Sequence, residues 1–403
     1  MISVKSAPRW LSIVNALTTM AFYSPILVLF FEYKGVGLGS FFLIQGIARL
    51  FIFITEIPTG YIGDIFSRKH TIISAFLMWI FGYLLWIFGY GFWFIICGEF
   101  FFSIAMALMS GTIEAYLYDL LKKRHKEEKY HLKLAKMETA ENFTVLLSTL
   151  PGAFLYQFFG PTAPIWATMF CLLIGLIILV FLPDVPESKR LVAKDKSKWQ
   201  DILDISKYAI KNKEIKWLMI FHAVYGTLTL AFWWGLQPIM IHQEIPVFVF
   251  GLVISMAAFM MTLWASISGK ILEKFKLSGV IKILSVTIIV ATGGACFAVY
   301  VPVWCTFICL FLTAIGSGSA AASKIVTSVL INHRIKSDER ATVLSVRSMF
   351  SKIFTGLGLI CLKPLFDNIG VGPTFMVSAL LLIPILICAR HLYKMNLKTM
   401  KEA

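Results

Sequence analysis

The chain has 403 residues, of which 58% are hydrophobic and 15% are charged. Soluble domains carry about 25% charged residues, so this composition excludes a water-soluble globular protein and indicates a polytopic membrane protein. The net charge of +15 is compatible with nucleic-acid binding by its size alone, but the placement of the basic residues assigns it to the membrane.

Twelve segments are apolar over the roughly 20 residues that a membrane-crossing helix needs. Helices are expected rather than strands, because lipid cannot satisfy the open edge of a sheet. The expected spans are residues 10–31, 39–60, 71–90, 92–116, 138–159, 164–182, 215–240, 246–269, 281–300, 302–328, 341–363 and 373–392.

The longest connection lies between the sixth and seventh spans and divides the chain into halves. We therefore expect an N-terminal six-helix bundle over residues 1–182 and a C-terminal bundle over 215–403. Residues 183–214 form the expected cytoplasmic linker, and apolar side chains from Trp199 to Tyr208 at roughly helical spacing predict an amphipathic surface helix within it.

The basic residues fix the expected orientation, because cytoplasmic loops are rich in Lys and Arg. With both termini inside, the inner loops and termini hold 31 of the 37 basic residues, and the outer loops hold only Lys34. Anionic lipid headgroups explain the excess of positive charge, so no nucleic acid is expected. The seven cysteines lie in apolar segments without metal-ligand spacing, and no disulfide or metal site is expected.

The halves share small motifs, as in transporters built from repeats. Gly60 and Asp64 separate spans two and three, and Gly269 and Glu273 occur at the same spacing between spans eight and nine. The pair Ser110-Gly111 in span four likewise matches Ser317-Gly318 in span ten.

These residues resemble the major facilitator superfamily. Its motif between helices two and three has a Gly, an Asp four residues later, a second Gly and a basic pair. Here it reads Gly60, Asp64, Ser67, Arg68 and Lys69. It departs from the family at Ile65, where an Arg is usual, and at Ser67, where the second Gly is usual. The preceding EIPTG stretch, residues 56–60, is similar to one bacterial branch of permeases.

The resemblance implies an all-α membrane protein with twelve transmembrane helices in two pseudo-symmetric bundles. It also implies that Asp64 meets the cytoplasmic start of helix eleven when the transporter is open outward, and Gly60, Arg68, Lys69 and Arg347 are assigned to this latch. A carboxylate beside a helix N-terminus gains about 0.3–1 kcal/mol. The alternatives are that Arg68 and Lys69 are only positive-inside anchors and that the Arg347 side chain snorkels to the surface.

Ionisable residues at membrane depth are candidates for function. Arg49 and Lys352 lie near the middle of spans two and eleven, and Lys324 lies nearer the cytoplasm in span ten. We expect substrate contacts from all three; a structural ion pair is the alternative for the first two, and snorkelling for Lys324. Polar and aromatic stripes extend the expected substrate site, although such residues can merely pack helices together. They are Asn15, Tyr23, Asn142, His222, Tyr225, Trp233 and Gln237.

Glu99, in span four, is the first candidate for a protonatable coupling carboxylate, and the alternative is a permanent ion pair with Arg49. Glu114 is the second candidate. It also belongs to an acidic group with Asp119, Glu138 and Glu141 at the inner ends of spans four and five, where a structural charge network with Arg68 is the alternative.

Three cations, Arg49, Lys324 and Lys352, face one deep carboxylate, Glu99. This excess of positive charge favours an anionic substrate, because Arg binds carboxylates through paired hydrogen bonds. The main hypothesis is a proton-coupled secondary transporter of a carboxylate metabolite or a carboxylate-type siderophore in the bacterial inner membrane. The alternative is a proton-coupled multidrug efflux pump for hydrophobic compounds. No GxxxxGK[ST] loop is present, so ATP drive is not expected. No enzyme motif, metal or cofactor is expected; the expected partners are substrate, protons and lipid, and the expected state is a monomer.

Overall fold

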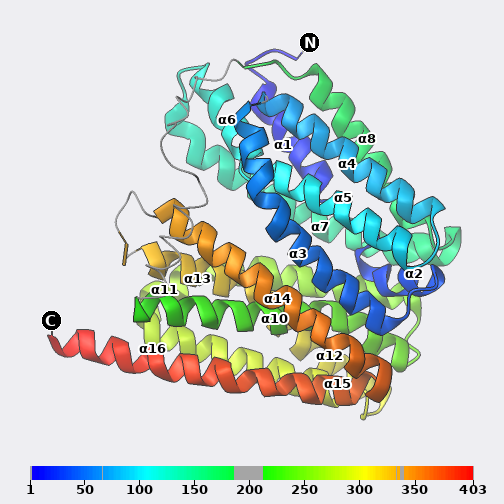
Figure 1. Cartoon of the computed structure of the whole chain (residues 1–403), viewed down its shortest axis with the longest axis vertical. Helices are drawn as coiled ribbons and strands as arrows, with labels where there is room; N and C mark the ends of the chain where they lie inside the picture. The colour runs from blue at the N-terminus through cyan, green and yellow to red at the C-terminus, as the bar shows by residue number, and fades with distance from the viewer. Residues whose placement is uncertain (1, 66, 186–211, 333, 336–339, 403) are drawn as a thin grey trace. The chain divides into compact units, whose positions relative to one another are not determined.

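The computed structural model describes residues 2–65, 67–185, 212–332, 334–335 and 340–402. It gives side chains for them except at 57–65, 142, 276–278, 340–342 and 394–402. Over these residues the chain is helical without strands (Figure 1). The amphipathic helix expected between residues 183 and 214 falls mostly on 186–211, outside the described residues.

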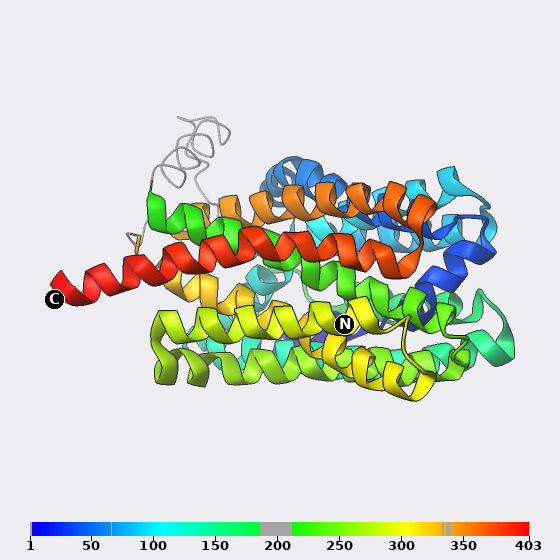
Figure 2. The same ribbon diagram turned by 90° about the horizontal axis from the view of Figure 1, so that it is seen from below.

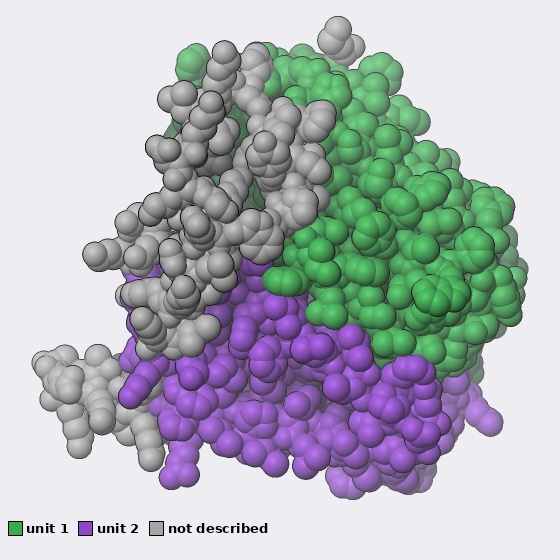
Figure 3. All heavy atoms as spheres, viewed as in Figure 1, with its two compact units in different colours: residues 1–192, 246–255 green, residues 193–245, 256–403 purple. Residues whose placement is uncertain are grey.

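Two compact units divide the chain (Figure 3). The first contains Met1–Val192 with Pro246–Ser255, and the second contains Ala193–Ile245 with Met256–Ala403. The helices of the first stretch are α1 (Ala7–Thr18), η1 (Ser24–Ile26), α2 (Leu27–Tyr33), α3 (Leu38–Ile65), α4 (Arg68–Phe88), α5 (Phe92–Met109), α6 (Thr112–Lys122), η2 (Glu127–Lys129), α7 (Tyr130–Phe159) and α8 (Ala163–Phe181). The expected boundaries at 182 and 215 stay predictions.

The remaining helices begin at residue 213. They are α10 (Lys213–His242), α11 (Val247–Phe297), α12 (Val303–Gly318), α13 (Ala320–Asn332), α14 (Arg340–Ile369), α15 (Val371–Ser378), η3 (Ala379–Leu381) and α16 (Leu382–Glu402). Helix α10 packs against α14 and α16, which run beside it in Figure 2. In the most apolar 18-residue stretch of α10, 67% of the residues are buried, a larger share than in any other candidate span of the described chain. It is therefore the central helix of the second unit.

Ten helical stretches in the described residues are long and apolar enough to cross a membrane. They include ten of the twelve expected spans, with α11 containing the eighth and ninth as Val247–Phe275 and Gly279–Phe297. The fifth expected span lies in the single helix α7. The all-α membrane fold is thus confirmed, and the total of twelve spans stays a prediction.

The first expected span is not one helix, which corrects the sequence expectation. It divides into α1, η1 and α2, with a break after Thr18. Side chains from other helices bind the backbone of the break: the amide of Ala21 donates to Ser148 Oγ (3.0 Å), and the amide of Phe22 donates to Thr168 Oγ1 (3.2 Å). A break at membrane depth requires such partners, because lipid offers none.

Two further spans are broken at matching places. Span four changes from α5 to α6 at Ser110 and Gly111, where Gly111 has a φ of 74°, a left-handed conformation that favours glycine. Span ten changes from α12 to α13 at Ser319, directly after Gly318. The Ser-Gly pairs that the two halves share in sequence therefore lie at helix breaks in both units.

Candidate functional site

The motif between spans two and three begins within a helix rather than in a loop. Helix α3 continues to Ile65, and α4 begins at Arg68, so the backbone of Gly60 and Asp64 is helical. Because a helix can extend beyond the membrane, the expected end of span two at residue 60 stays a prediction. The side chain of Asp64 is not among those described, and its contact with the start of span eleven stays a prediction.

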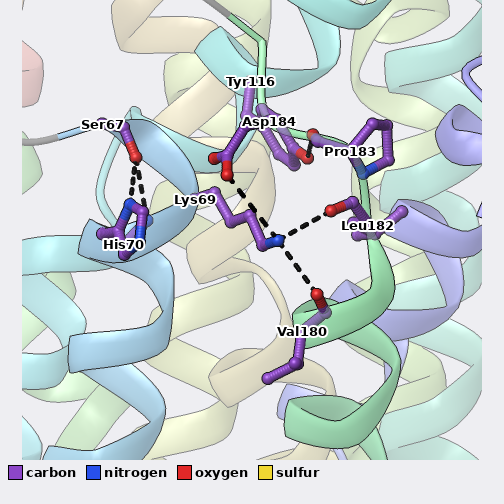
Figure 4. Close-up of polar contacts among 8 residues, drawn as sticks. All are labelled: Ser67, Lys69, His70, Tyr116, Val180, Leu182, Pro183 and Asp184. Atoms are coloured by element: carbon purple, nitrogen blue, oxygen red, sulfur yellow. Dashed lines mark hydrogen bonds and ion pairs between the residues drawn. The ribbon is translucent and has the colours of Figure 1, made fainter. Parts of the chain in front are cut away.

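Lys69 binds the end of α8, as Figure 4 shows. Its ammonium donates to the carbonyl oxygens of Val180 (2.9 Å) and Leu182 (2.7 Å) and lies 4.0 Å from Asp184 Oδ2. The last carbonyl groups of a helix lack partners within the helix, and a Lys side chain satisfies them. Lys69 therefore fastens α4 to α8 within the first unit.

Arg68 fastens α4 to α6. Its Nε lies 2.8 Å from Asp119 Oδ2, and the two side chains are 25% and 10% exposed. On the same helix, the hydroxyl of Tyr116 donates to the carbonyl oxygen of Pro183 (2.6 Å). Glu114 lies two residues before Tyr116, and its Oε2 is buried with no hydrogen-bond partner among the described residues. The ion pair of Arg68 with Asp119 corresponds to the structural charge network that was the alternative for the acidic group at the inner ends of spans four and five.

A buried carboxylate, Glu99, lies between α3 and α5. The amide of Gln45 donates to Glu99 Oε1 (2.9 Å), and both side chains are buried. The hydroxyl of Ser103 is directed to backbone oxygens, those of Glu99 (2.8 Å) and Ala48 (3.3 Å), and so is not bonded to the carboxylate. Half-buried Arg49 interacts with the Glu99 charge electrostatically, but no direct ion pair joins them among the described residues.

A cluster of aromatic side chains lies near this carboxylate. The rings of Tyr23 and Tyr83 have centroids 5.7 Å apart. The ring centroid of Phe102 lies 4.5 Å from that of Tyr83 and 4.8 Å from that of Trp86. The Glu99 charge acts on both tyrosines. Sequence reasoning identified Tyr23 but missed Tyr83 and Trp86, which lie on a helix without deep charges.

Asn15 bonds to an acidic residue on another helix. Its side-chain amide donates to Glu141 Oε1, and four residues later the hydroxyl of Thr19 lies 2.7 Å from that of Thr144. These contacts join α1 to α7 next to the break in span one. Tyr23 lies beyond the end of α1, so it does not continue a helical stripe from Asn15, which corrects that expectation. The side chain of Asn142 is not described.

In the second unit, two predicted site residues of α10 bind the segment from 319 to 323. The hydroxyl of Tyr225 lies 2.5 Å from that of Ser319, at the break of span ten, and donates to the Leu284 oxygen (3.3 Å). One turn away, His222 Nδ1 lies 3.3 Å from Ser323 Oγ. Tyr225 therefore stabilises the helix break of span ten, whereas His222 lies beside the next turn of α13.

Arg347 is buried and binds α13 rather than extending to the surface. Its Nη1 donates to the backbone oxygen of Lys324 (3.0 Å) and to the hydroxyls of Thr327 (2.9 Å) and Ser328 (2.7 Å). The side chain of Lys324 is exposed. The structure thus brings His222, Lys324 and Arg347 together on three neighbouring helices of the second unit.

The other predicted residues of this unit lie on α10 and α14. Gln237 is fully buried, and Trp233 and Lys352 are half-buried. Gln237 and Lys352 both have interaction partners.

Comparison with known proteins identifies the family. The sequence model of the Major Facilitator Superfamily matches residues 10–359. An uncharacterized transporter, BU466, of Buchnera aphidicola subsp. Acyrthosiphon pisum (strain APS) is 28% identical over 159 residues, which are 39% of each chain. The matched part of the chain therefore spans 39% of the length of that relative.

Solved structures resemble this fold along its length. The nucleoside transporter NupG has a TM-score of 0.79 at 15% identity, with 97% of this chain and 99% of that chain covered. A POT family transporter in complex with 5-aminolevulinic acid has a TM-score of 0.68 at 14% identity, with 96% of each chain covered. These likenesses concern the fold, and the family match concerns the chain itself: this protein belongs to the Major Facilitator Superfamily.

Proposed function

We propose that the protein moves a small organic anion, a carboxylate metabolite or a carboxylate-type siderophore, across the bacterial inner membrane by proton-coupled alternating access. The observation that carries the proposal is the set of cations at membrane depth. Arg347 is buried, and Arg49 and Lys352 are half-buried. Cations at this depth are costly, so their presence argues for a role in binding. For Arg347, whose acceptors among the described residues are all uncharged, an anionic substrate would supply the opposite charge.

Glu99 is the proposed proton carrier. Its carboxylate has one neutral donor, the amide of Gln45, and one nearby cation, Arg49. When Glu99 is ionised, its charge attracts the Arg49 guanidinium. When Glu99 takes up a proton, that attraction is lost, and Arg49 is free to bind a substrate carboxylate through paired hydrogen bonds. Proton binding and anion binding then favour each other, which is the coupling that a symporter requires.

Transport in proteoliposomes tests this proposal. We expect labelled citrate or succinate to accumulate under an imposed pH gradient in the wild type. Glu99→Gln is expected to lose gradient-driven accumulation by tenfold or more while retaining substrate exchange, because the amide keeps the shape but cannot carry the proton. Glu244→Gln, an acid-to-amide change at an exposed residue beyond α10, is the matched control. Unchanged accumulation in Glu99→Gln would remove the coupling role, and wild-type protein that transports no organic anion would remove the function.

The aromatic cluster beside Glu99 favours a second candidate, a proton-coupled efflux pump for hydrophobic compounds. Tyr23, Tyr83, Trp86 and Phe102 pack against one another, and the two tyrosines lie within electrostatic range of Glu99. Aromatic faces attract lipophilic cations. Tetraphenylphosphonium is a suitable probe. Its transport, abolished by Glu99→Gln and unaffected by Arg49→Gln, would support the pump and exclude the anion transporter.

A further inference from the structure

Arg347 is a buried cation that the described part of the chain does not neutralise. It is 6% exposed, and its three acceptors, the Lys324 oxygen and the hydroxyls of Thr327 and Ser328, are all uncharged. Its Nε is buried and has no hydrogen-bond partner among the described residues. A buried charge without a counter-charge costs several kcal/mol. Among the described residues the Nε of Arg347 therefore lacks an acceptor, and an anionic acceptor would stabilise it best.

Two other basic side chains lie at the same place. His222 of α10 is bonded through Nδ1 to Ser323, the residue before Lys324 on α13. The charges of both Arg347 and Lys324 act on His222. Helices α10, α13 and α14 contact one another within the second unit. Three helices thus direct one imidazole and two cations to one region, where like charges repel unless an anion lies among them.

We propose that His222, Lys324 and Arg347 form a subsite in the second unit that binds one oxyanion group, a carboxylate or phosphate, of the transported substrate. This inference rests on the proposed anion transport and names the group of the substrate that the second unit holds. It also assigns Arg347 to the substrate instead of the cytoplasmic latch.

Each member has a distinct part in the subsite. Arg347 is held in place through Nη1 by α13, so its Nε is oriented before an anion arrives and little entropy is lost on binding. Lys324 is exposed and flexible, and it supplies a point charge that follows the anion. His222, steadied by Ser323, adds a ring nitrogen at the border of the site.

Snorkelling does not account for this arrangement. A snorkelling Arg extends its guanidinium to the membrane surface, whereas that of Arg347 is buried and bonded to three groups of α13. Lys324 alone has the exposure that snorkelling requires. The cluster would also repel a lipophilic cation, which separates this inference from the efflux alternative.

Binding to the purified full-length protein tests the subsite, with succinate, citrate and inorganic phosphate as probes. We expect at least one probe to raise the melting temperature of the wild type. Arg347→Gln is expected to weaken its binding tenfold or more, Arg347→Lys and Lys324→Gln several-fold each. The matched control is Lys363→Gln on the same helix, which removes a cation that is paired with Asp367. This control is expected to bind the probe as the wild type does.

The outcomes separate the subsite from the proposed function. If an anion binds the wild type and all of these variants equally, the subsite is wrong and anion transport stands. If no anion stabilises the wild type but tetraphenylphosphonium does, both fall. Should Arg347→Gln fail to fold, the exposed Lys324→Gln and the charge-preserving Arg347→Lys decide. Nanodiscs with and without phosphatidylglycerol form the last arm: stabilisation by that lipid alone, lost in Lys324→Gln, would assign a lipid headgroup to the site and overturn the substrate role.

Discussion

At the scale of single residues, the hydrogen bond from Gln45 to Glu99 can be tested by a double-mutant cycle. Gln45→Leu leaves a buried carboxylate without its donor, which costs about 1–3 kcal/mol, so we expect a lower melting temperature. The double replacement with Glu99→Leu is expected to cost less than the two single replacements together, because no buried carboxylate then remains. Thermal unfolding of the four proteins in detergent measures this, and strictly additive losses would count against the bond.

The ion pair of Arg68 and Asp119 allows a charge-swap test. The pair is mostly buried at 25% and 10% side-chain exposure, so removal of either partner by Arg68→Gln or Asp119→Asn is expected to cost about 1.5–3 kcal/mol. The swap of Arg68→Asp with Asp119→Arg restores opposite charges, and we expect it to recover part of the lost melting temperature. A swap that is less stable than both single variants would contradict a pairwise role.

The positions of charged residues within apolar helices were predictable from sequence, but their partners were not. Arg49 and Glu99 stand out because each is a charge far inside an apolar run. Tyr83 gives no such signal, since neutral aromatic residues are common in every membrane helix. The acceptors of Arg347 depend on how α13 and α14 are rotated about their axes, and hydropathy says nothing about rotation.

At the scale of elements, the break of span one depends on close packing by α7. A Cβ at Gly152 would lie 1.9 Å from the carbonyl oxygen of Phe22, which is too close for any side chain. We expect Gly152→Ala to displace the break and to cost about 1–3 kcal/mol through overpacking. Gly293→Ala is the matched control, because a Cβ there meets no atom within 4 Å and alanine favours a helix interior. Thermal unfolding compares them, and equal melting temperatures would show that α7 does not constrain the break.

The lengths of the spans could be predicted from sequence, whereas the positions of the helix breaks could be predicted only in part. Hydropathy over about 20 residues sets span length, and α4 and α8 match their expected ranges to within three residues at each end. The break after Thr18 had no local signal, because its partners Ser148 and Thr168 are more than a hundred residues away. The breaks of spans four and ten had a weak signal in their shared Ser-Gly pairs.

At the scale of the whole molecule, each unit has its own buried aromatic core. Trp86, Tyr116 and Phe76 are among the largest fully buried side chains of the first unit, and Tyr225 and Phe232 are among those of the second. The matched breaks in spans four and ten add a structural correspondence to the repeated sequence motifs. The proposed alternating access would require two such units, each able to move as a body.

The orientation of the chain in the membrane stays a prediction, and the structure accounts for the basic residue that departs from the expected pattern. Lys34 is the basic residue that the sequence assigns to the outer loops, yet it is only 5% exposed. Its ammonium donates to the carbonyl oxygens of Ile87 (2.6 Å) and Gly89 (2.9 Å), at the end of α4. This lysine therefore has a structural role at the end of α4, which accounts for the one basic residue in the expected outer loops.

Reporter fusions test this orientation. Because inner loops retain Lys and Arg on the cytoplasmic side, we expect green fluorescent protein to fluoresce and alkaline phosphatase to be inactive when either is fused after Ala403. After Tyr300, in the turn that precedes α12, the expected activities are reversed, and fusions after Lys123 serve as a second inner control. An active phosphatase after both Lys123 and Ala403 would place the basic loops outside and invert the assignment of the Arg68 network to the cytoplasmic face.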